Sequence, residues 1–166
     1  QGILVDQWAL WAKKTGVKVD IHAMDWGEAL TSMKNGEFDV IDTIFRTDER
    51  AKIYDFSAPY AKIDVPIFFT TNISGITNAS SLKGFPVAVK SGDAAIEYLY
   101  NNGVTDLHEY PSYEEVIKAA GERKEIVFVV DKPAALYLLY KNGLQDRFNY
   151  SDPLYSGDFH RAVSKG

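Results

Sequence analysis

The sequence predicts an α/β fold with mostly parallel strands and helices on both sides of the sheet. Segments with apolar residues at helical spacing alternate along the chain with short segments typical of strands. The stretch 126–130 is continuously apolar, as is usual for strands buried on both faces of a parallel sheet. Capping residues and glycines separate these segments, so each has a defined beginning and end.

The first half of the chain is expected to contain, in order, a helix over 3–15, a strand over 17–21, a helix opening at Asp25 and a strand over 38–44. Residues 17–21 alternate between apolar and polar, which predicts a strand with one buried face. Asp25 and Glu28 form a capping-box pair at the start of the second helix. Gly16 and Gly36 are placed to end the two helices.

The second half is expected to repeat this alternation, with strands over 65–69, 86–89 and 126–130 and helices over 93–100, from Ser112 onward and over 133–140. Ser112 and Glu115 form another capping pair, and Pro133 suits the first turn of its helix. Pro59 favours an extended conformation for the residue before it. A strand that leaves one sheet and enters another is therefore expected, with its crossing at 60–64.

Composition excludes several kinds of partner and chemistry. The 166 residues carry a net charge of −5 without a run of Lys or Arg, so nucleic acid is not an expected partner. No apolar run approaches the roughly 20 residues that span a bilayer. The first residues lack the basic region of a signal peptide, although a mature exported fragment would look the same. The absence of cysteine excludes disulfides, thiol catalysis and zinc–thiolate sites.

Motifs of common cofactor-binding and catalytic sites are absent from the sequence. There is no GxGxxG, no P-loop and no Gly-x-Ser-x-Gly elbow. His22, His108 and His160 are far apart and lack a second ligand at helical spacing. We therefore expect no cofactor, no metal and no catalytic residue.

Arg50 is the first candidate binding residue. Thr47 can cap a short helix, which would place Arg50 in its first turn. A guanidinium group beside a helix N-terminus makes a carboxylate receptor, because it adds fork-shaped donors to free backbone N–H groups. The alternative is a surface arginine paired with Asp48, Glu49 or Asp55.

Further candidates follow predicted strand ends. Ser91-Gly92-Asp93 lies between a strand and a helix, where backbone donors can meet an anion, or Asp93 is only a helix cap. Asp131 ends a predicted strand, at the edge where open α/β sheets bind ligands. It either receives a cation or caps the next helix. Trp26 either stacks on a ligand or packs in the core.

Three motifs together resemble a known family: 33–40 (MKNGEFDV), 47–50 (TDER) and 55–60 (DFSAPY). Later segments at 82–92, 131–134 and 157–166 agree with it in the same order. The sequence is similar to the family-3 extracellular solute-binding proteins, which have the type II periplasmic-binding fold. The similarity covers nearly the whole chain and is greatest with the sensor domains of histidine kinases and diguanylate cyclases.

The resemblance implies a two-lobed α/β fold with a ligand held between the lobes. The implied parts are lobe 1 at 1–60, a first crossing at 61–64, lobe 2 at 65–154, a second crossing at 155–160 and a return to lobe 1 at 161–166. Compared with the family, the chain is expected to lack the first strand and the last helices.

The resemblance also implies ligand contacts. In the amino-acid binders, the arginine at the position of Arg50 holds the ligand carboxylate, and the acid at the position of Asp131 meets the amino group. The turn at 91–94 supplies further donors, including that of Ser91, and an aromatic residue near Trp26 packs on the ligand.

Three residues depart from the amino-acid-binding pattern. Phe45 and Arg46 stand where those proteins have small, Gly- and Thr-rich residues, and Asp93 stands where they have Thr or Ser. At close range Asp93 would repel a ligand carboxylate by ~1 to 4 kcal/mol. Either Arg46 neutralises Asp93, or the ligand is not an ordinary α-amino acid. All three residues are therefore candidates for the site.

The expected function is extracytoplasmic binding of an amino acid or related carboxylate, without enzyme activity, as the sensor domain of a membrane-tethered signalling receptor. One alternative is the free binding protein of an amino-acid ABC transporter. Another is an enzyme like the cyclohexadienyl dehydratases, with Asp93 or Asp131 as the acid. A third is an interaction domain without a ligand. A homodimer is one form that the parent protein can take.

Overall fold

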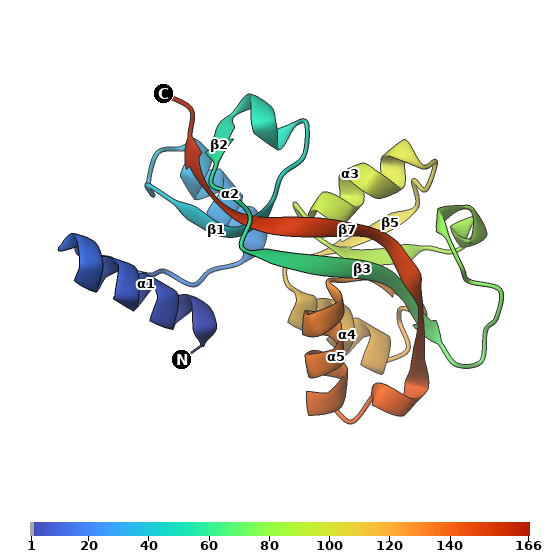
Figure 1. The fold of residues 1–166 in the computed structure, drawn as a ribbon. Helices are drawn as coiled ribbons and strands as arrows, with labels where there is room; N and C mark the ends of the chain where they lie inside the picture. Colours follow the sequence, from blue (N-terminus) through green and yellow to red (C-terminus); the bar gives the residue numbers. More distant parts are fainter. Residues whose placement is uncertain (1) are drawn as a thin grey trace.

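The computed structural model describes residues 2–166 (Figure 1). Its helices are α1 (Ile3–Thr15), α2 (Trp26–Lys34), α3 (Ala94–Asn101), α4 (Tyr113–Gly121) and α5 (Lys132–Lys141). Its strands are β1 (Ile41–Phe45), β2 (Tyr54–Phe56), β3 (Ala61–Thr70), β4 (Val87–Lys90), β5 (Leu107–Tyr110), β6 (Val127–Val129) and β7 (Phe148–Ser164). Three short 3-10 helices are η1 (Arg50–Lys52), η2 (Ala79–Leu82) and η3 (Gln145–Arg147).

The strands form one mixed sheet in the order β1-β7-β3-β6-β4-β5, and β2 pairs with β7 as well. Among the described strands only β4 pairs in parallel, with β5 on one side and β6 on the other, so the prediction of mostly parallel strands is wrong. The other pairs are antiparallel: β7 runs antiparallel to β1, β2 and β3, and β3 runs antiparallel to β6.

The long pair β3–β7 connects two parts of the molecule. It runs from Ala61 opposite Phe159 to Thr70 opposite Phe148. Figure 1 shows β3 in green and β7 in red passing from the part with β1, β2 and α2 to the part with α3, α4 and α5. The expected change from one sheet to another near 60–64 is not found, because the strands belong to one sheet, and residues 61–64 are the first residues of β3.

Apolar side chains of β3 are buried on both faces of the sheet. Ile67 and Phe69 join the core beneath α3, whereas Phe68 joins the core beneath α4 and α5. Phe68 lies opposite Phe128 of β6, and their rings stack with centroids 5.1 Å apart. A smaller third core lies between α2, β1, β2 and β7. The continuous apolar runs of the sequence therefore belong to central strands, as expected.

Most predicted helices are found, with differences at their caps. Gly16 ends α1 in a left-handed conformation, with φ of 74°. The Ser112 hydroxyl accepts a hydrogen bond from the Glu115 N–H at the start of α4, as predicted. Asp25 is the N-cap of α2, but its side chain makes no capping hydrogen bond, so the predicted capping box is absent there.

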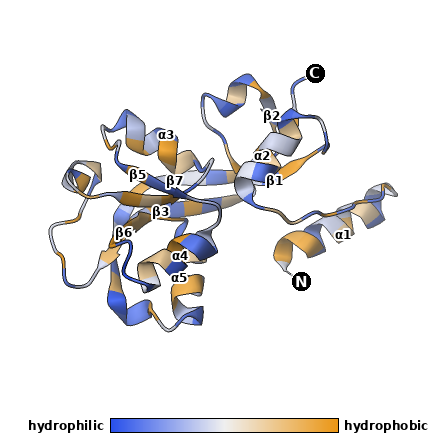
Figure 2. Cartoon of the chain, turned by 180° about the vertical axis from the view of Figure 1, so that it is seen from behind, coloured by the Kyte–Doolittle hydropathy of each residue, from blue (hydrophilic) through white to orange (hydrophobic). Residues whose placement is uncertain are grey.

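The predicted strand at 17–21 is not formed. Val17 and Ile21 are exposed, and no strand pairs with this segment within residues 2–166. An alternating pattern produces a strand only where a neighbouring strand accepts its hydrogen bonds. Helix α1, just before it, has no buried side chain and projects from the body of the molecule (Figure 2).

We expect Gly157→Ala to destabilise the fold. A Cβ at Gly157 would lie 2.9 Å from two ring atoms of Phe45, which is buried. Displacing a packed ring should lower the free energy of unfolding by ~1 to 3 kcal/mol in chemical denaturation. Gly27→Ala is the matched control: its Cβ meets only an oxygen at 4.0 Å. Because Gly27 lies within α2, that change should be stabilising. Equal unfolding midpoints for wild type and Gly157→Ala would contradict this expectation.

Candidate functional site

A cavity of about 200 Å³ lies where α2, β1 and η1 face the ends of β4 and β6 and the starts of α3, α4 and α5. Four charged side chains line it: Arg50, Lys90, Asp93 and Asp131. The remaining lining residues are Trp26, Thr43, Phe45, Ala94, Tyr113, Ala134 and Phe159. Five predicted site residues are thus brought together, namely Trp26, Phe45, Arg50, Asp93 and Asp131.

Arg50 uses its guanidinium group to join two segments of the chain. One terminal nitrogen donates to the carbonyl of Phe45 at 2.9 Å, and the other donates to the carbonyl of Gly92 at 2.8 Å. Thr47 accepts a hydrogen bond from the Arg50 N–H, as a capping residue does. The helix that follows is only the three-residue η1, so Arg50 is not aided by a long helix. Burial lowers the pKa of Arg50, and Asp93 opposes this effect.

Trp26 forms part of the cavity wall beside two cations. Its indole N–H donates to the Gly92 carbonyl at 3.2 Å, the same oxygen that Arg50 contacts. The Arg50 guanidinium lies 5.7 Å and the Lys90 ammonium 5.1 Å from its ring centroid. The ring also packs against the small core beneath α2. Trp26 therefore packs on the core and also lines the cavity.

Asp93 is buried and has two hydrogen-bond partners. One oxygen accepts from the Ala95 N–H and caps α3, while the other accepts from the Tyr113 hydroxyl at 2.7 Å. Arg46, the expected neutralising cation, is exposed and lies outside the cavity lining. Arg46 comes directly after the last residue of β1, the buried Phe45, and consecutive side chains of an extended segment point to opposite sides. Arg50 and Lys90 instead provide the positive charge around Asp93.

Asp131 is the N-cap residue of α5, but its side chain makes no capping hydrogen bond. Its carboxyl group is buried and lines the cavity. Burial, with the charge of Asp93, raises the pKa of Asp131 to about 7, although Lys90, Tyr113 and Arg50 act in the opposite direction. The carboxyl group is therefore suited to accept a proton or a cation from the cavity.

Lys90 is a cavity residue that the sequence analysis missed. Its ammonium group lies 3.8 Å from the ring centroid of Tyr113. Burial lowers the pKa of Lys90, while Asp93 and Asp131 raise it. Lys90 ends β4, so the argument from strand ends that selected Asp131 would have found it. Ser91, the next residue, lies outside the cavity lining, and its N–H donates to the carbonyl of Tyr110.

Three further lining residues, Thr43, Tyr113 and Phe159, carried no signal in the sequence. Tyr113 is recognisable only once α4 is packed, because its hydroxyl reaches Asp93 from another element. Burial is the main reason that the pKa of Tyr113 is raised, and both Asp93 and Asp131 add to it. Tyr113 therefore stays protonated and acts as a hydrogen-bond donor.

Residues 1–121 match the bacterial extracellular solute-binding proteins, family 3. The chain belongs to this family. It is 32% identical over 134 residues to the L-cystine-binding protein TcyJ of Escherichia coli K12, covering 78% of this chain and 50% of that protein. It is 27% identical over 153 residues to the virulence sensor protein BvgS of Bordetella pertussis, covering 88% of this chain and 12% of that protein. The chain thus spans half the length of TcyJ and a small part of BvgS.

Solved structures confirm the two-lobed periplasmic-binding type of fold. A histidine kinase sensor domain with similarity to periplasmic binding proteins has a TM-score of 0.90 and 22% identity, over 98% of this chain and 72% of that one. Holo ArgBP from T. maritima has a TM-score of 0.86 and 23% identity, over 99% of this chain and 73% of that one.

In residues 2–166, no helix is both long and apolar enough to cross a bilayer. Within the same residues, no group of three or more His, Asp or Glu side chains is arranged to hold a metal ion.

The raised pKa of Asp131 makes stability depend on pH. Since the folded state holds this proton more tightly than the unfolded chain, the free energy of unfolding should fall as pH rises from about 4 to about 7. Asp131→Asn should remove this contribution. We expect the stability of the variant relative to wild type to increase by ~2 to 4 kcal/mol over this range in chemical denaturation. Exposed Asp39→Asn is the control. A difference between Asp131→Asn and wild type that does not vary with pH would contradict the assignment.

Proposed function

We propose that the cavity binds a small polar ligand, an amino acid or a related carboxylate, and that the chain is the ligand-binding part of a signalling receptor. The observation that carries this proposal is the cavity itself. Two cations and two carboxylates line it together with aromatic rings, and they come from both parts of the molecule. A ligand that carries both charges would find a partner for each.

The positive and negative groups suggest how such a ligand is oriented. Arg50 and Lys90 are the groups that can attract a ligand carboxylate, although Arg50 already donates to two carbonyls. Asp131 and Asp93 are the groups that can attract an ammonium. Two carboxylates in one buried cavity repel each other, which contributes to the raised pKa of Asp131. A ligand ammonium would relieve this repulsion and favour the ionised carboxylate.

We also propose the lobe boundaries implied by the family: lobe 1 at 1–60, crossings at 61–64 and 155–160, lobe 2 at 65–154 and a return to lobe 1 at 161–166. In support, the segment 26–50 supplies one wall of the cavity and the segment 90–134 supplies the facing wall. The crossings fall within β3 and β7, which pair with each other. Ligand bound between the lobes would shift the population toward the closed arrangement.

Two comparisons favour a receptor over a free binding protein: the share of the chain that matches a sensor protein, and the TM-score with a sensor domain. The similarity to the sensor protein BvgS covers 88% of the chain, and that to TcyJ covers 78%. A histidine kinase sensor domain superposes with a TM-score of 0.90, and the binding protein of an amino acid ABC transporter with 0.84.

We expect the complete gene product to contain a transmembrane helix followed by a signalling domain. A product without either would contradict the receptor proposal and favour a transporter's binding protein.

The enzyme alternative has one observation in its favour. Asp131, with its pKa raised to about 7, is the kind of acid that an elimination reaction requires. The relatives reported above are named as binding and sensor proteins, so we propose that the cavity binds without chemical conversion. Prephenate and arogenate belong in the ligand panel for this reason, and no aromatic product should form from them.

The binding proposal predicts a large effect of Arg50→Ala. A thermal-shift panel of amino acids and dicarboxylates should yield a stabilising ligand, and calorimetry should give its Kd. Removing Arg50 should weaken binding by ~2 to 5 kcal/mol, because a charge pair in the cavity is lost. Arg46→Ala removes the same side chain four residues away, outside the cavity lining, and should bind as wild type does. Unchanged affinity in Arg50→Ala would exclude Arg50 from the site.

A further inference from the structure

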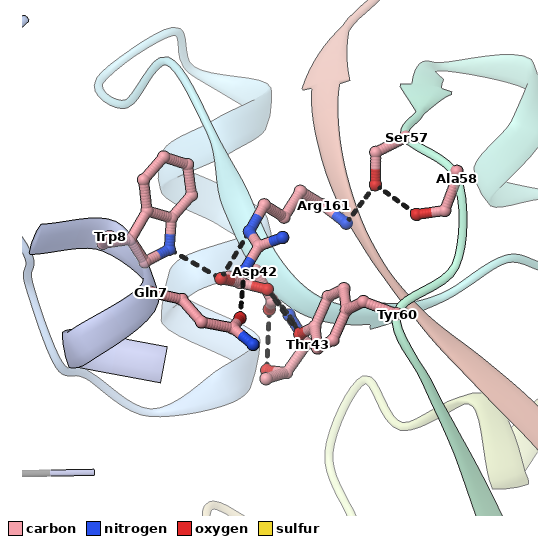
Figure 3. Close-up of polar contacts among 8 residues, drawn as sticks. All are labelled: Gln7, Trp8, Asp42, Thr43, Ser57, Ala58, Tyr60 and Arg161. Atoms are coloured by element: carbon pink, nitrogen blue, oxygen red, sulfur yellow. Dashed lines mark hydrogen bonds and ion pairs between the residues drawn. The ribbon is translucent and has the colours of Figure 1, made fainter. Parts of the chain in front are cut away.

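Asp42 of β1 binds two different parts of the structure with its two carboxylate oxygens (Figure 3). One oxygen accepts hydrogen bonds from the Thr43 N–H at 2.6 Å and from the Tyr60 hydroxyl at 2.5 Å. The other accepts from the indole of Trp8 at 2.7 Å and from Arg161 at 3.2 Å. A single rigid group thus meets four donors from four segments of the chain.

The first oxygen faces the cavity wall. Thr43 lines the cavity and has a φ of 57°, in the left-handed region that a β-branched residue rarely adopts. It lies where the register of β1 with β7 is interrupted, between Ile41 and Ile44. The Thr43 N–H donates to Asp42 and also to the Tyr60 oxygen at 3.2 Å. These two contacts hold Thr43 in a conformation that would otherwise be unfavourable.

The second oxygen faces α1. This helix has no buried side chain, so its place depends on a few polar and aromatic contacts. Trp8 donates to Asp42, and Gln7 accepts a hydrogen bond from Arg161 at 2.7 Å. The Arg161 guanidinium also lies 5.0 Å from the ring centroid of Trp8 and 4.5 Å from that of Tyr60. Asp42 and Arg161 together therefore connect α1 to the sheet.

We propose that Asp42 is a positioning residue that couples the cavity to helix α1. The proposal rests on the proposed function, since it treats Thr43 as part of a ligand-binding wall. When a ligand displaces Thr43, the hydrogen bonds to the first oxygen must readjust. The carboxylate is planar and rigid, so its second oxygen moves with the first, and Trp8 follows. The position of α1 then reports whether the cavity is occupied.

The three tryptophan indoles provide the test, by nuclear magnetic resonance of their N–H groups in the ¹⁵N-labelled chain. Trp26 reports the cavity and Trp8 reports α1. Trp11 lies on the same helix, with its ring centroid 5.6 Å from that of Trp8, and serves as a second reporter of α1. Trp8→Phe assigns the Trp8 resonance. The probe ligands are L-arginine and L-glutamine.

In wild type, the Trp26 and Trp8 resonances should shift with the same Kd, and Trp11, on the same helix as Trp8, should shift with them. Asp42→Asn replaces one acceptor oxygen with a donor. In this variant Trp26 should still shift, with affinity weakened roughly 2- to 30-fold, while Trp8 no longer follows. A Trp8 resonance that stays fixed in wild type while Trp26 shifts would overturn the proposal. The same conclusion holds if Trp8 still follows in Asp42→Asn.

A second measurement needs no ligand and separates this proposal from the proposed function. Thr43→Gly relaxes the left-handed conformation at the cavity wall. It should shift the Trp8 resonance in the wild-type background and leave it unchanged in the Asp42→Asn background. If neither probe ligand moves Trp26, binding of these amino acids is contradicted, and the Thr43→Gly comparison still decides the coupling. If Thr43→Gly leaves the Trp8 resonance unchanged in the wild-type background, the proposed coupling between the cavity wall and α1 is rejected.

Tyr60→Phe replaces Asp42→Asn in both measurements if the latter does not fold. It removes one donor to the first oxygen and keeps the carboxylate with its Arg161 partner. The Trp8 response should then be reduced relative to wild type. An undiminished response in Tyr60→Phe would overturn the proposal.

Discussion

The antiparallel pairing of β3 with β7 is the constraint on which the rest of the structure depends. At one end β7 also pairs with β1 and β2, and at the other end β3 pairs with β6, which in turn pairs with β4. The two walls of the cavity are therefore attached to opposite ends of one pair of strands. Small changes in the twist of this pair would alter the distance between Arg50 and Asp131, because no other strand among residues 2–166 connects the segments that carry them.

The charges of the cavity come at a cost in stability. Removing Arg50, Lys90, Asp93 and Asp131 from water is unfavourable, and their mutual attraction offsets this only in part. Burial lowers the pKa of both cations and raises that of Asp131, which is the direction expected when desolvation outweighs pairing. A fold selected for stability alone would place apolar residues here. The charges are instead consistent with a binding function.

Local sequence patterns predicted the elements that are determined by nearby residues. They did not predict the elements that form only through contacts with distant segments. The helix ended by Gly16, the Ser112 cap and the buried strand at 127–129 have short-range signals. β7 was missed because its polar sequence, with Pro153 and Gly157, becomes a strand only through pairing with β1, β2 and β3. The cavity residues at strand ends were predictable in principle. The role of Asp42 was not predictable, since its partners Trp8 and Arg161 are 34 and 119 residues away along the chain.

Asp42 and Asp131 show how similar carboxylates acquire different roles. Asp42 accepts hydrogen bonds from four donors, one of them the cation Arg161, so both of its oxygens have partners within the chain. Asp131 lies close to Asp93, makes no capping hydrogen bond and faces the cavity. A carboxylate with hydrogen-bond and ion-pair partners on both oxygens fixes the structure around it. A carboxylate whose neighbours offset the cost of burial only in part favours the approach of a proton or a ligand cation. Asp42 is therefore suited to hold the cavity wall in place, and Asp131 is suited to contact a ligand in the cavity.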